Sequence, residues 1–164
     1  MGIAIQNGIK YMQVLGAGGG GGGSVELLFF LECVGQDTPQ IPAIQNLELG
    51  DKFSEYLSFD STTRKFTVIK DFSGIATQWV NTYRTASSST SEGDFYINDK
   101  QYIHNKCETR YEGDKEGRSL AFKFSVGDVF WVYTPSGSGY PQQYCKVYLS
   151  DADFTNVVNF ADDN

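Results

Sequence analysis

The clearest pattern along the chain is the alternation of apolar and polar side chains over residues 120–126. A period of two is typical of a strand that buries one face and exposes the other. Residues 65–72 alternate in the same way, apart from a break at residues 69–70. We therefore expect a half-buried strand in each segment. In the first, the side chains predicted to face inward are Leu120, Phe122, Phe124 and Val126, and those predicted to face outward are Ala121, Lys123 and Ser125.

Short runs of aromatic and β-branched residues, separated by turn residues, predict further strands. VFWVYT, residues 129–134, is apolar on both faces and is expected in the centre of a sheet. No helical period is found after residue 50, so the pattern favours an all-β sandwich or barrel. The other expected strands are residues 53–59, 75–84, 95–97, 101–103 and 144–149. The expected turns are 60–63, 98–99 and 127–128, and the expected loops are 86–93, 105–117 and 135–143.

The first 24 residues combine an apolar peptide with a glycine run. Residues 1–15 are too short to fold alone and too apolar to be stable in water, and residues 16–24 include six consecutive glycines. Because glycine has the widest backbone freedom, this run is predicted to be a flexible tether spanning about 15 Å. Two alternatives remain open: a polyglycine packed among copies of itself, and an engineered linker.

Residues 25–50 are expected to connect the tether to a head formed by residues 51–150. The decapeptide VELLFFLECV at the start of this connection is apolar on both faces, so it fits either a buried strand or a short helix. The segment after it contains Pro39 and Pro42 and is expected to be a loop. Residues 151–164 form an acidic tail, which is either ordered around its apolar residues or dangling.

Composition supports a β fold and excludes several functions. Aromatic residues make up 15% of the 164 residues and there are 18 glycines, which favours strands and turns. The net charge of −7 repels phosphate backbones, so nucleic-acid binding is not expected. No apolar run approaches the roughly 20 residues that span a bilayer, so membrane insertion is not expected either. No secretory signal is recognised.

The cysteines argue against a disulfide framework. Cys33, Cys107 and Cys145 are odd in number and lack the CxxC spacing of a zinc site. Three reduced, mostly buried thiols are expected, which suits a protein assembled in a cytosol. A single bridge between Cys107 and Cys145 is the alternative.

The sequence contains no recognisable catalytic or metal-binding constellation, and no cofactor is expected. His104 is the only histidine, so a histidine-dependent triad would have to use it. It lies near a predicted turn and is expected to be an ordinary polar side chain. Asp151 with Asp153, or Asp60 with its neighbouring hydroxyls, supplies too few oxygens for calcium, which takes about six to eight. The glycine run lacks the lysine and the strand–helix context of a phosphate-binding loop.

The order of motifs resembles that of the C1q/TNF-like jelly-roll domains. The resemblance covers residues 53–149 and rests on Phe66-Thr67-Val68, Gly74 with the aromatic strand 75–83, the hairpin Tyr96-Ile97-Asn98-Asp99, and the corner Gly127-Asp128 with the strands on either side of it. It implies an antiparallel jelly-roll sandwich, with the segment before it as an extended N-terminal arm. It also implies that the head assembles as a homotrimer about a threefold axis.

The aromatic residues themselves favour such an assembly. A sandwich of this size has one inner core, and surplus aromatic side chains need a second dry surface, which a subunit interface supplies. The alternative is that all of them fill one large core. The residues predicted to lie at the trimer interface are Trp79, Tyr83, Phe130 and Val132.

Domains similar to this one occur in bacteriophage head fibres and at fibre tips, and the layout of the chain fits that use. A short peptide that binds weakly as one copy gains avidity when a trimer carries three. We therefore predict a virion structural protein, a head fibre or capsid decoration spike, assembled in the host cytoplasm and displayed on the virion surface. Its predicted capsid anchor, which would bind capsid or other virion proteins, comprises Ile3, Ile5, Ile9, Tyr11, Met12, Val14 and Leu15.

Adhesion to a host-surface glycan is a further expected role. Tyr140 in the 135–143 loop is the best candidate for a ligand contact, with Gln142 beside it, and an ordinary wet turn is the alternative. Two other functions would keep the same sandwich: a small tail-fibre or baseplate tip that binds a receptor, and a monomeric carbohydrate-binding module. No enzymatic activity is predicted.

Overall fold

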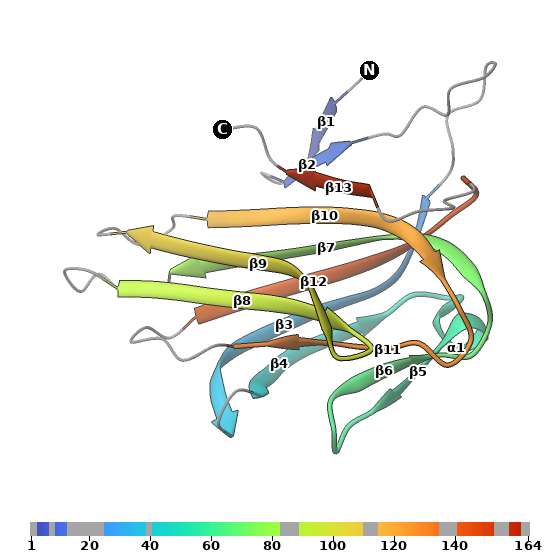
Figure 1. The fold of residues 1–164 in the computed structure, drawn as a ribbon, viewed down its shortest axis with the longest axis horizontal. Helices are drawn as coiled ribbons and strands as arrows, with labels where there is room; N and C mark the ends of the chain where they lie inside the picture. Colours follow the sequence, from blue (N-terminus) through green and yellow to red (C-terminus); the bar gives the residue numbers. More distant parts are fainter. Residues whose placement is uncertain are drawn as a thin grey trace.

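Two antiparallel β-sheets face each other in a computed structural model of the chain (Figure 1). The structure describes residues 3–6, 9–12, 25–38, 41–82, 89–109, 115–134, 141–152 and 158–161. Among these residues the larger sheet has six strands, in the spatial order β13 (Val158–Ala161), β10 (Lys115–Phe124), β7 (Phe72–Thr82), β12 (Pro141–Ser150), β3 (Val25–Thr38) and β4 (Ile41–Leu49).

The smaller sheet has five described strands, in the order β5 (Leu57–Asp60), β6 (Lys65–Val68), β11 (Val129–Tyr133), β8 (Ser89–Ile97) and β9 (Lys100–Thr109). A single helical turn, α1 (Phe53–Tyr56), leads into β5. Near the N-terminus, β1 (Ile3–Gln6) and β2 (Ile9–Met12) pair with each other as a separate two-stranded sheet. No helix in the described part of the chain has the length and hydropathy of a membrane span.

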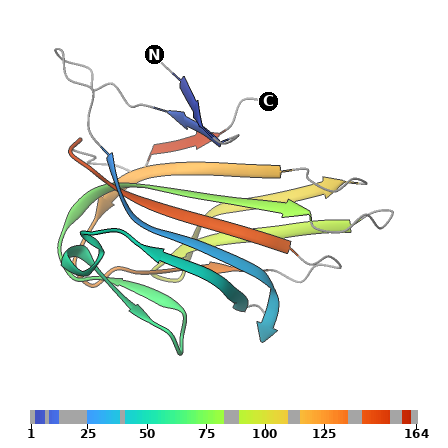
Figure 2. The same ribbon diagram turned by 180° about the vertical axis from the view of Figure 1, so that it is seen from behind.

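The path of the chain is that of a jelly roll. From β7 the chain crosses to the smaller sheet for the hairpin β8–β9, returns as β10, crosses again as β11, and comes back as β12 between β7 and β3. Figure 2 shows the same two layers from behind. All pairings within both sheets are antiparallel. The predicted fold class, an antiparallel jelly-roll sandwich, is confirmed.

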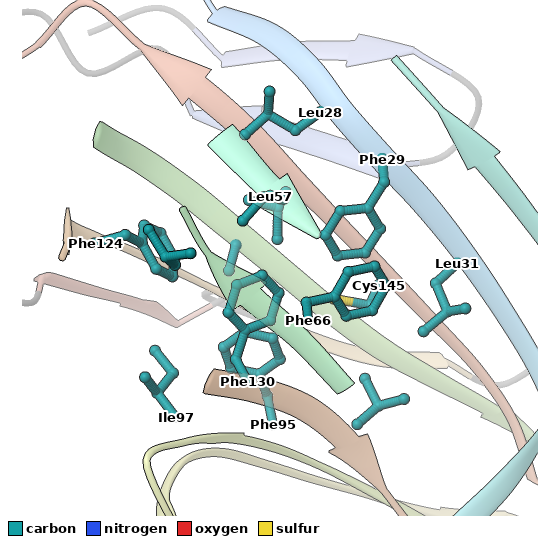
Figure 3. Packing of buried hydrophobic residues seen from close by; sticks show 14 of the residues in the cluster. Leu28, Phe29, Leu31, Leu57, Phe66, Phe95, Ile97, Phe124, Phe130 and Cys145 are labelled. Carbon is teal, nitrogen blue, oxygen red and sulfur yellow. The ribbon is translucent and has the colours of Figure 1, made fainter. Parts of the chain in front are cut away.

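A layer of phenylalanine rings joins the two sheets (Figure 3). Phe29 of β3 stacks on Phe66 of β6 with ring centroids 4.1 Å apart, and Phe66 stacks on Phe130 of β11 at 5.3 Å. Phe95 and Phe124 lie 5.7 and 5.6 Å from Phe130. All five side chains are at most 1% exposed. Because these rings come from both sheets, their packing fixes how one sheet sits over the other.

Two tight turns that the sequence predicts are confirmed, and they are linked to each other. Asn98 and Asp99, between β8 and β9, have φ values of 50° and 63°, as a two-residue hairpin turn requires. Gly127 has a φ of 92°, which favours glycine. Next to it, the Asp128 carboxylate accepts hydrogen bonds from the Ser125 backbone N–H at 2.8 Å and from the Asn98 side-chain amide at 2.7 Å.

Residues 25–50 belong to the sandwich, which corrects their prediction as a connecting segment. β3 lies between β12 and β4 in the larger sheet. Its side chains Phe29 and Leu31 are at most 2% exposed and help form the core. Pro42, expected in a loop, lies in β4, which is an edge strand of the described sheet. An edge position tolerates proline because one side of the strand has no ladder partner.

Three other predicted boundaries also differ from the structure. Residues 53–56 form α1 rather than the start of a strand. Residues 69–71 separate β6 from β7, at the place where the 65–72 alternation breaks. β8 begins at Ser89 and β9 continues to Thr109, so much of the two polar segments predicted as loops forms a long hairpin. These segments were predicted as loops because they are polar, but this part of the hairpin buries polar rather than apolar side chains.

The alternation over residues 120–126 also needs two corrections. Val126, predicted to face inward, is 62% exposed because β10 ends at Phe124 and the chain then turns. Ala121, predicted to face outward, is fully buried. It pairs with Val158 of β13, so part of the acidic tail is ordered as an additional strand.

Replacing Phe66 by alanine is expected to lower the free energy of unfolding by about 3–5 kcal/mol, the range for truncating a buried aromatic side chain. The reason is that the Phe66 ring contacts rings from both sheets. The matched control is Ile69→Ala, just beyond β6, where the side chain is 46% exposed and the expected change is about 0.5 kcal/mol or less. Urea unfolding measures both, and equal losses would contradict the assigned core.

Candidate functional site

Three aromatic side chains gather on the outer face of the larger sheet, the face turned away from the core. They are Phe30 of β3, Tyr144 of β12 and Trp79 of β7, which are adjacent strands, and we call them the aromatic patch. The Trp79 and Tyr144 rings stack at 4.9 Å with an interplanar angle of 11°. Phe30 lies 6.1 Å from Tyr144 and 6.4 Å from Trp79. Each of the three side chains keeps part of its surface exposed.

The strand register places these rings together. Tyr144 is the cross-strand partner of Trp79, and Lys146 is the partner of Phe30. On its other side Trp79 pairs with Gly117 of β10. A Cβ atom at position 117 would lie 2.8 Å from the Trp79 Cβ, closer than such atoms approach. Glycine at this position therefore gives the tryptophan its space on the sheet.

Polar groups surround the Tyr144 end of the patch. The Tyr144 hydroxyl donates a hydrogen bond to the side-chain oxygen of Gln142 at 3.2 Å. Burial is the main cause that raises the pKa of Tyr144 above its ordinary value, and the negative charge of Glu32 acts in the same direction. The side-chain oxygen of Asn81 is buried and has no hydrogen-bond partner in the described part of the chain. A buried acceptor of this kind is costly unless a donor reaches it.

A cation lies at the other end of the patch. The Lys146 ammonium is 5.4 Å from the centroid of the Phe30 ring and 5.8 Å from that of Trp79. The patch therefore combines stacked rings with one basic side chain, an acidic side chain at Glu32 and amide groups. Aromatic rings bordered by polar groups are typical of a protein–protein interface.

The structure confirms an outward position for only one of the residues predicted at a trimer interface. Trp79 belongs to the aromatic patch, whereas Tyr83 lies outside the described residues. Phe130 is fully buried and Val132 is 8% exposed, and both face the core of a single copy. Their prediction as interface residues is wrong, because in β11 the alternate positions face outward. Phe30, Tyr144, Asn81 and Lys146 were not predicted.

The outer face of the smaller sheet carries a second set of rings. Trp131 of β11 and Tyr96 of β8 stack at 5.5 Å with an interplanar angle of 9°, and Tyr133 meets Tyr96 edge-on. The Lys65 ammonium lies 3.8 Å from the centroid of the Trp131 ring. Trp131 is thus packed between a cation and another ring within one copy, and this arrangement needs no second chain.

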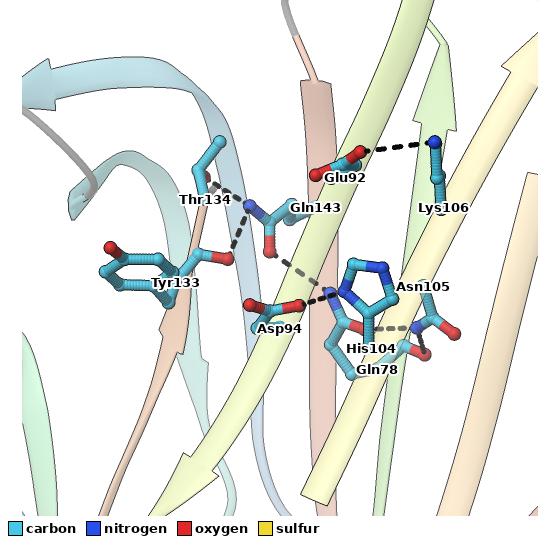
Figure 4. A network of polar contacts seen from close by, with 9 residues as sticks. All are labelled: Gln78, Glu92, Asp94, His104, Asn105, Lys106, Tyr133, Thr134 and Gln143. Carbon is cyan, nitrogen blue, oxygen red and sulfur yellow. Dashed lines mark hydrogen bonds and ion pairs between the residues drawn. The ribbon is translucent and has the colours of Figure 1, made fainter. Parts of the chain in front are cut away.

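A buried network of amide side chains connects the sheets (Figure 4). Gln78 of β7 donates to Gln143 of β12 at 3.1 Å, and Asn105 of β9 donates to the Gln78 carbonyl at 2.8 Å. Gln143 also donates to the Thr134 hydroxyl. A Cβ at Gly93 would lie 2.5 Å from the Gln78 amide nitrogen, so only glycine leaves room for the network. These hydrogen bonds give the network a structural role, although the side-chain oxygen of Asn105 is buried without a partner among the described residues.

His104 lies in β9 rather than in a turn, beside the same network. Its Nδ1 is 2.7 Å from the carboxylate of Asp94, which is 4% exposed, whereas the imidazole is 48% exposed (Figure 4). The buried carboxylate fixes the orientation of the ring. Glu92 and Lys106 form a longer ion pair next to it, at 3.8 Å. No cluster of three or more metal-ligating side chains is found among the described residues.

All three cysteines are buried and free, so the prediction of reduced thiols is confirmed and the alternative Cys107–Cys145 bridge is not formed. Burial raises the pKa of Cys33 to about 12, although the nearby Arg64 acts in the opposite direction. Burial also raises the pKa of Cys145 strongly. At neutral pH both groups are protonated thiols that pack as small apolar side chains.

The other predicted site residues are only partly placed. Gln142 lies in β12, where it borders the aromatic patch instead of belonging to a loop. Ile3 and Ile5 lie in β1, and Ile9, Tyr11 and Met12 lie in β2; the structure describes the backbone of these strands but not their side chains. Val14, Leu15 and Tyr140 lie outside the described residues.

No protein-family model and no curated protein matches the sequence. Among solved structures, the chain is similar to Eiger TNF from S. frugiperda, with 7% sequence identity and a TM-score of 0.48. The similarity covers 80% of this chain and 96% of the other. Values this low carry no argument about function. The jelly-roll assignment rests on the strand order given above.

The buried thiols predict a loss of stability at alkaline pH. In the unfolded chain the Cys33 thiol ionises near its ordinary pKa of 9.0, whereas in the folded chain it holds its proton up to about pH 12. Between these values the folded state binds more protons, so the free energy of unfolding falls by about 1.4 kcal/mol per pH unit for each such thiol. The variant with Cys33→Val and Cys145→Val is expected to lose this slope in urea titrations from pH 8 to 11. An unchanged slope would contradict the account.

Proposed function

We propose that the chain is a homotrimeric virion structural protein of a bacteriophage, a head fibre or capsid decoration spike. In this proposal the copies associate through the aromatic patch, and the N-terminal arm attaches the head to the particle. The observation that carries it is the cluster of Phe30, Trp79 and Tyr144 on the outer face of the larger sheet.

The chemistry of the patch supports association with copies of the same chain. Stacked rings contribute most when water is removed from their exposed surface. Lys146 and Glu32 lie at the border of the patch, so copies related by rotation can bring opposite charges together. The number of copies, three, comes from the resemblance to C1q/TNF-like domains.

The N-terminal strands support the second half of the proposal. β1 and β2 pair over four residues each, with Ile3 opposite Met12. A two-stranded hairpin of this length is marginally stable by itself in water. Residues 13–24, with their glycine run, separate it from β3. A short hairpin on a glycine-rich connection is suited to docking on another protein, and a trimer presents three of them.

Light scattering of the full chain at micromolar concentration is expected to give three times the 18.2 kDa mass of one copy. The double variant Trp79→Ser and Tyr144→Ser is expected to run as a folded monomer, because it removes the stacked pair of the patch. The matched control, Tyr96→Ser with Trp131→Ser, removes a stacked pair from the other sheet and is expected to remain trimeric.

Three outcomes of this measurement would contradict the proposal, in whole or in part. A monomer of the unmodified chain would reject the interface and favour a solitary carbohydrate-binding sandwich. Dissociation by the control variant but not by the patch variant would move the interface to the smaller sheet. A dimer that the patch variant dissociates would keep the interface and reject the trimer.

Deletion of residues 1–24 is expected to leave a folded trimer that is no longer incorporated into virions, because both sheets of the sandwich are formed by residues after this segment. Incorporation is measured by immunoblotting of purified particles. In the matched control, residues 16–24 are replaced by nine residues of another glycine–serine sequence, and incorporation is expected to persist. Normal incorporation of the deleted form would show that residues 1–15 are not the anchor.

A further inference from the structure

At one end of the sandwich β3 begins, β4 ends and α1 leads into the smaller sheet (Figure 1). β10 and β12 end there too, beside the first residues of β7. The turn that follows β10 joins the two sheets at this end, because Gly127 donates a backbone hydrogen bond to the carbonyl of Val68, the last residue of β6, at 2.9 Å. We call this part of the molecule the α1 end.

Exposed hydrophobic side chains gather at the α1 end. Val25 is the first residue of β3, and Leu49 is the last residue of β4. Ile69 directly follows β6, and Val126 lies in the turn after β10. These residues are between 46% and 62% exposed, and in the described part of the chain no other large hydrophobic residue is exposed to this degree. A single exposed hydrophobic residue is ordinary, but their concentration at one end is typical of an interaction surface.

Hydrogen bonds between neighbouring turns join these positions into one surface. The Val126 backbone N–H donates to the Asp71 carboxylate at 2.7 Å, and Asp71 lies two residues after Ile69. The Ile69 backbone N–H donates to the carbonyl of Tyr56 in α1 at 2.8 Å. An ion pair of 2.7 Å links the residue just before α1 to the second residue of β3. The surface therefore runs from β3 through α1 to the turn after β10.

Carboxylates border the α1 end. Glu26 and Glu55 are paired with Lys52 and Lys70. Outside these pairs, the turns and strand ends carry more aspartates than lysines: Asp51, Asp71, Asp99, Asp128 and Asp151 against Lys100 and Lys123. A partner surface that is apolar in its centre and basic at its border would therefore complement this end.

The N-terminal arm joins the head at the same end. Residues 13–24 connect β2 directly to Val25, the first residue of β3. Even when fully extended, a connection of this length reaches no more than about 40 Å. The α1 end is thus the part of the head that lies closest along the chain to any protein that binds the arm.

We propose that the α1 end docks the head onto the particle protein that binds the arm, and that this protein presents an apolar surface bordered by basic side chains. The inference rests on the proposed function. Docking removes the exposed hydrophobic side chains from water, and the surrounding carboxylates meet basic groups of the partner. Copies of the chain associate through the aromatic patch on the outer face of the larger sheet, so the two contacts use different surfaces.

The test is labelling of thiols by a fluorescent maleimide in intact virions and in the purified full chain. Val126→Cys places a thiol at the α1 end, and the three native cysteines are buried. The matched control is Lys106→Cys, at another exposed position, in β9. Both introduced thiols are expected to react rapidly in the purified chain. In virions the reaction at residue 126 is expected to slow by about 10-fold or more, because a packed interface excludes the reagent, and the reaction at residue 106 to stay unchanged.

A second variant tests whether the hydrophobic side chains themselves hold the head in place. Leu49→Ser with Val126→Ser changes two residues outside the hydrophobic core, so the mass by light scattering is expected to stay that of the unmodified chain. The amount of this variant in purified virions is expected to fall by about 10-fold or more, because the lost contact is repeated in every copy of the trimer. Lys106→Ser is the control and is expected to be incorporated normally.

The possible results separate this inference from the proposed function. Equal labelling of the two thiols in virions, or normal incorporation of the double serine variant, would overturn the docking surface and leave the proposed function standing. Absence of the unmodified chain from virions would reject both. Slow labelling of residue 126 in the purified chain would also overturn the inference. Recovery of fast labelling after deletion of residues 1–24 would then assign the surface to the arm itself, and its persistence would assign the surface to another copy.

Discussion

The packing of phenylalanine rings between the sheets is the constraint on which the rest of the structure depends. Phe29, Phe66 and Phe130 come from three strands and two sheets, and their stacking sets the register in which the sheets face each other. Because successive side chains in a strand point to opposite faces, placing Phe29 and Phe130 inward places Phe30 and Trp131 outward. The external aromatic surfaces are therefore a consequence of the core.

The two outer faces differ in how closely their aromatic rings are covered within one copy. On the smaller sheet, Lys65 and Tyr96 pack against Trp131, so that its ring is contacted within one copy. On the larger sheet, the Lys146 ammonium is 5.8 Å from the centroid of the Trp79 ring, compared with 3.8 Å between Lys65 and the Trp131 ring. The Trp79 ring is therefore covered less closely by its own copy, and this difference is why the proposed interface lies on the larger sheet.

The sequence predicts two turns and the central strand of this fold, but not which face of that strand is buried. The turns at Asn98-Asp99 and Gly127-Asp128 follow from residue types that tolerate positive φ, and the central strand 129–134 follows from its apolar character. Because this strand is apolar on both faces, its sequence does not show which face is buried. Phe130 is therefore predicted at an interface, whereas it lies in the core. Only the neighbouring strands decide which side is inside.

Long polar strands escape prediction for a related reason. The half of the β8–β9 hairpin that contains Asn105 buries the amide of this residue, whose partner, Gln78 of β7, is remote in sequence. Likewise, the sequence of β3 fits either a helix or a strand. Its position between β12 and β4 is what makes it a strand. Phe30 and Tyr144 could not be recognised as neighbours without this register, since they belong to strands more than a hundred residues apart.

The most direct test of the account is the solvent exposure of Trp79 in the assembled protein. In a Trp131→Phe background Trp79 is the only tryptophan, so acrylamide quenching of fluorescence reports on the aromatic patch alone. If copies cover this surface, quenching is weak at micromolar concentration and becomes stronger when the protein is diluted until it dissociates. Strong quenching that is the same at every concentration tested would contradict the account.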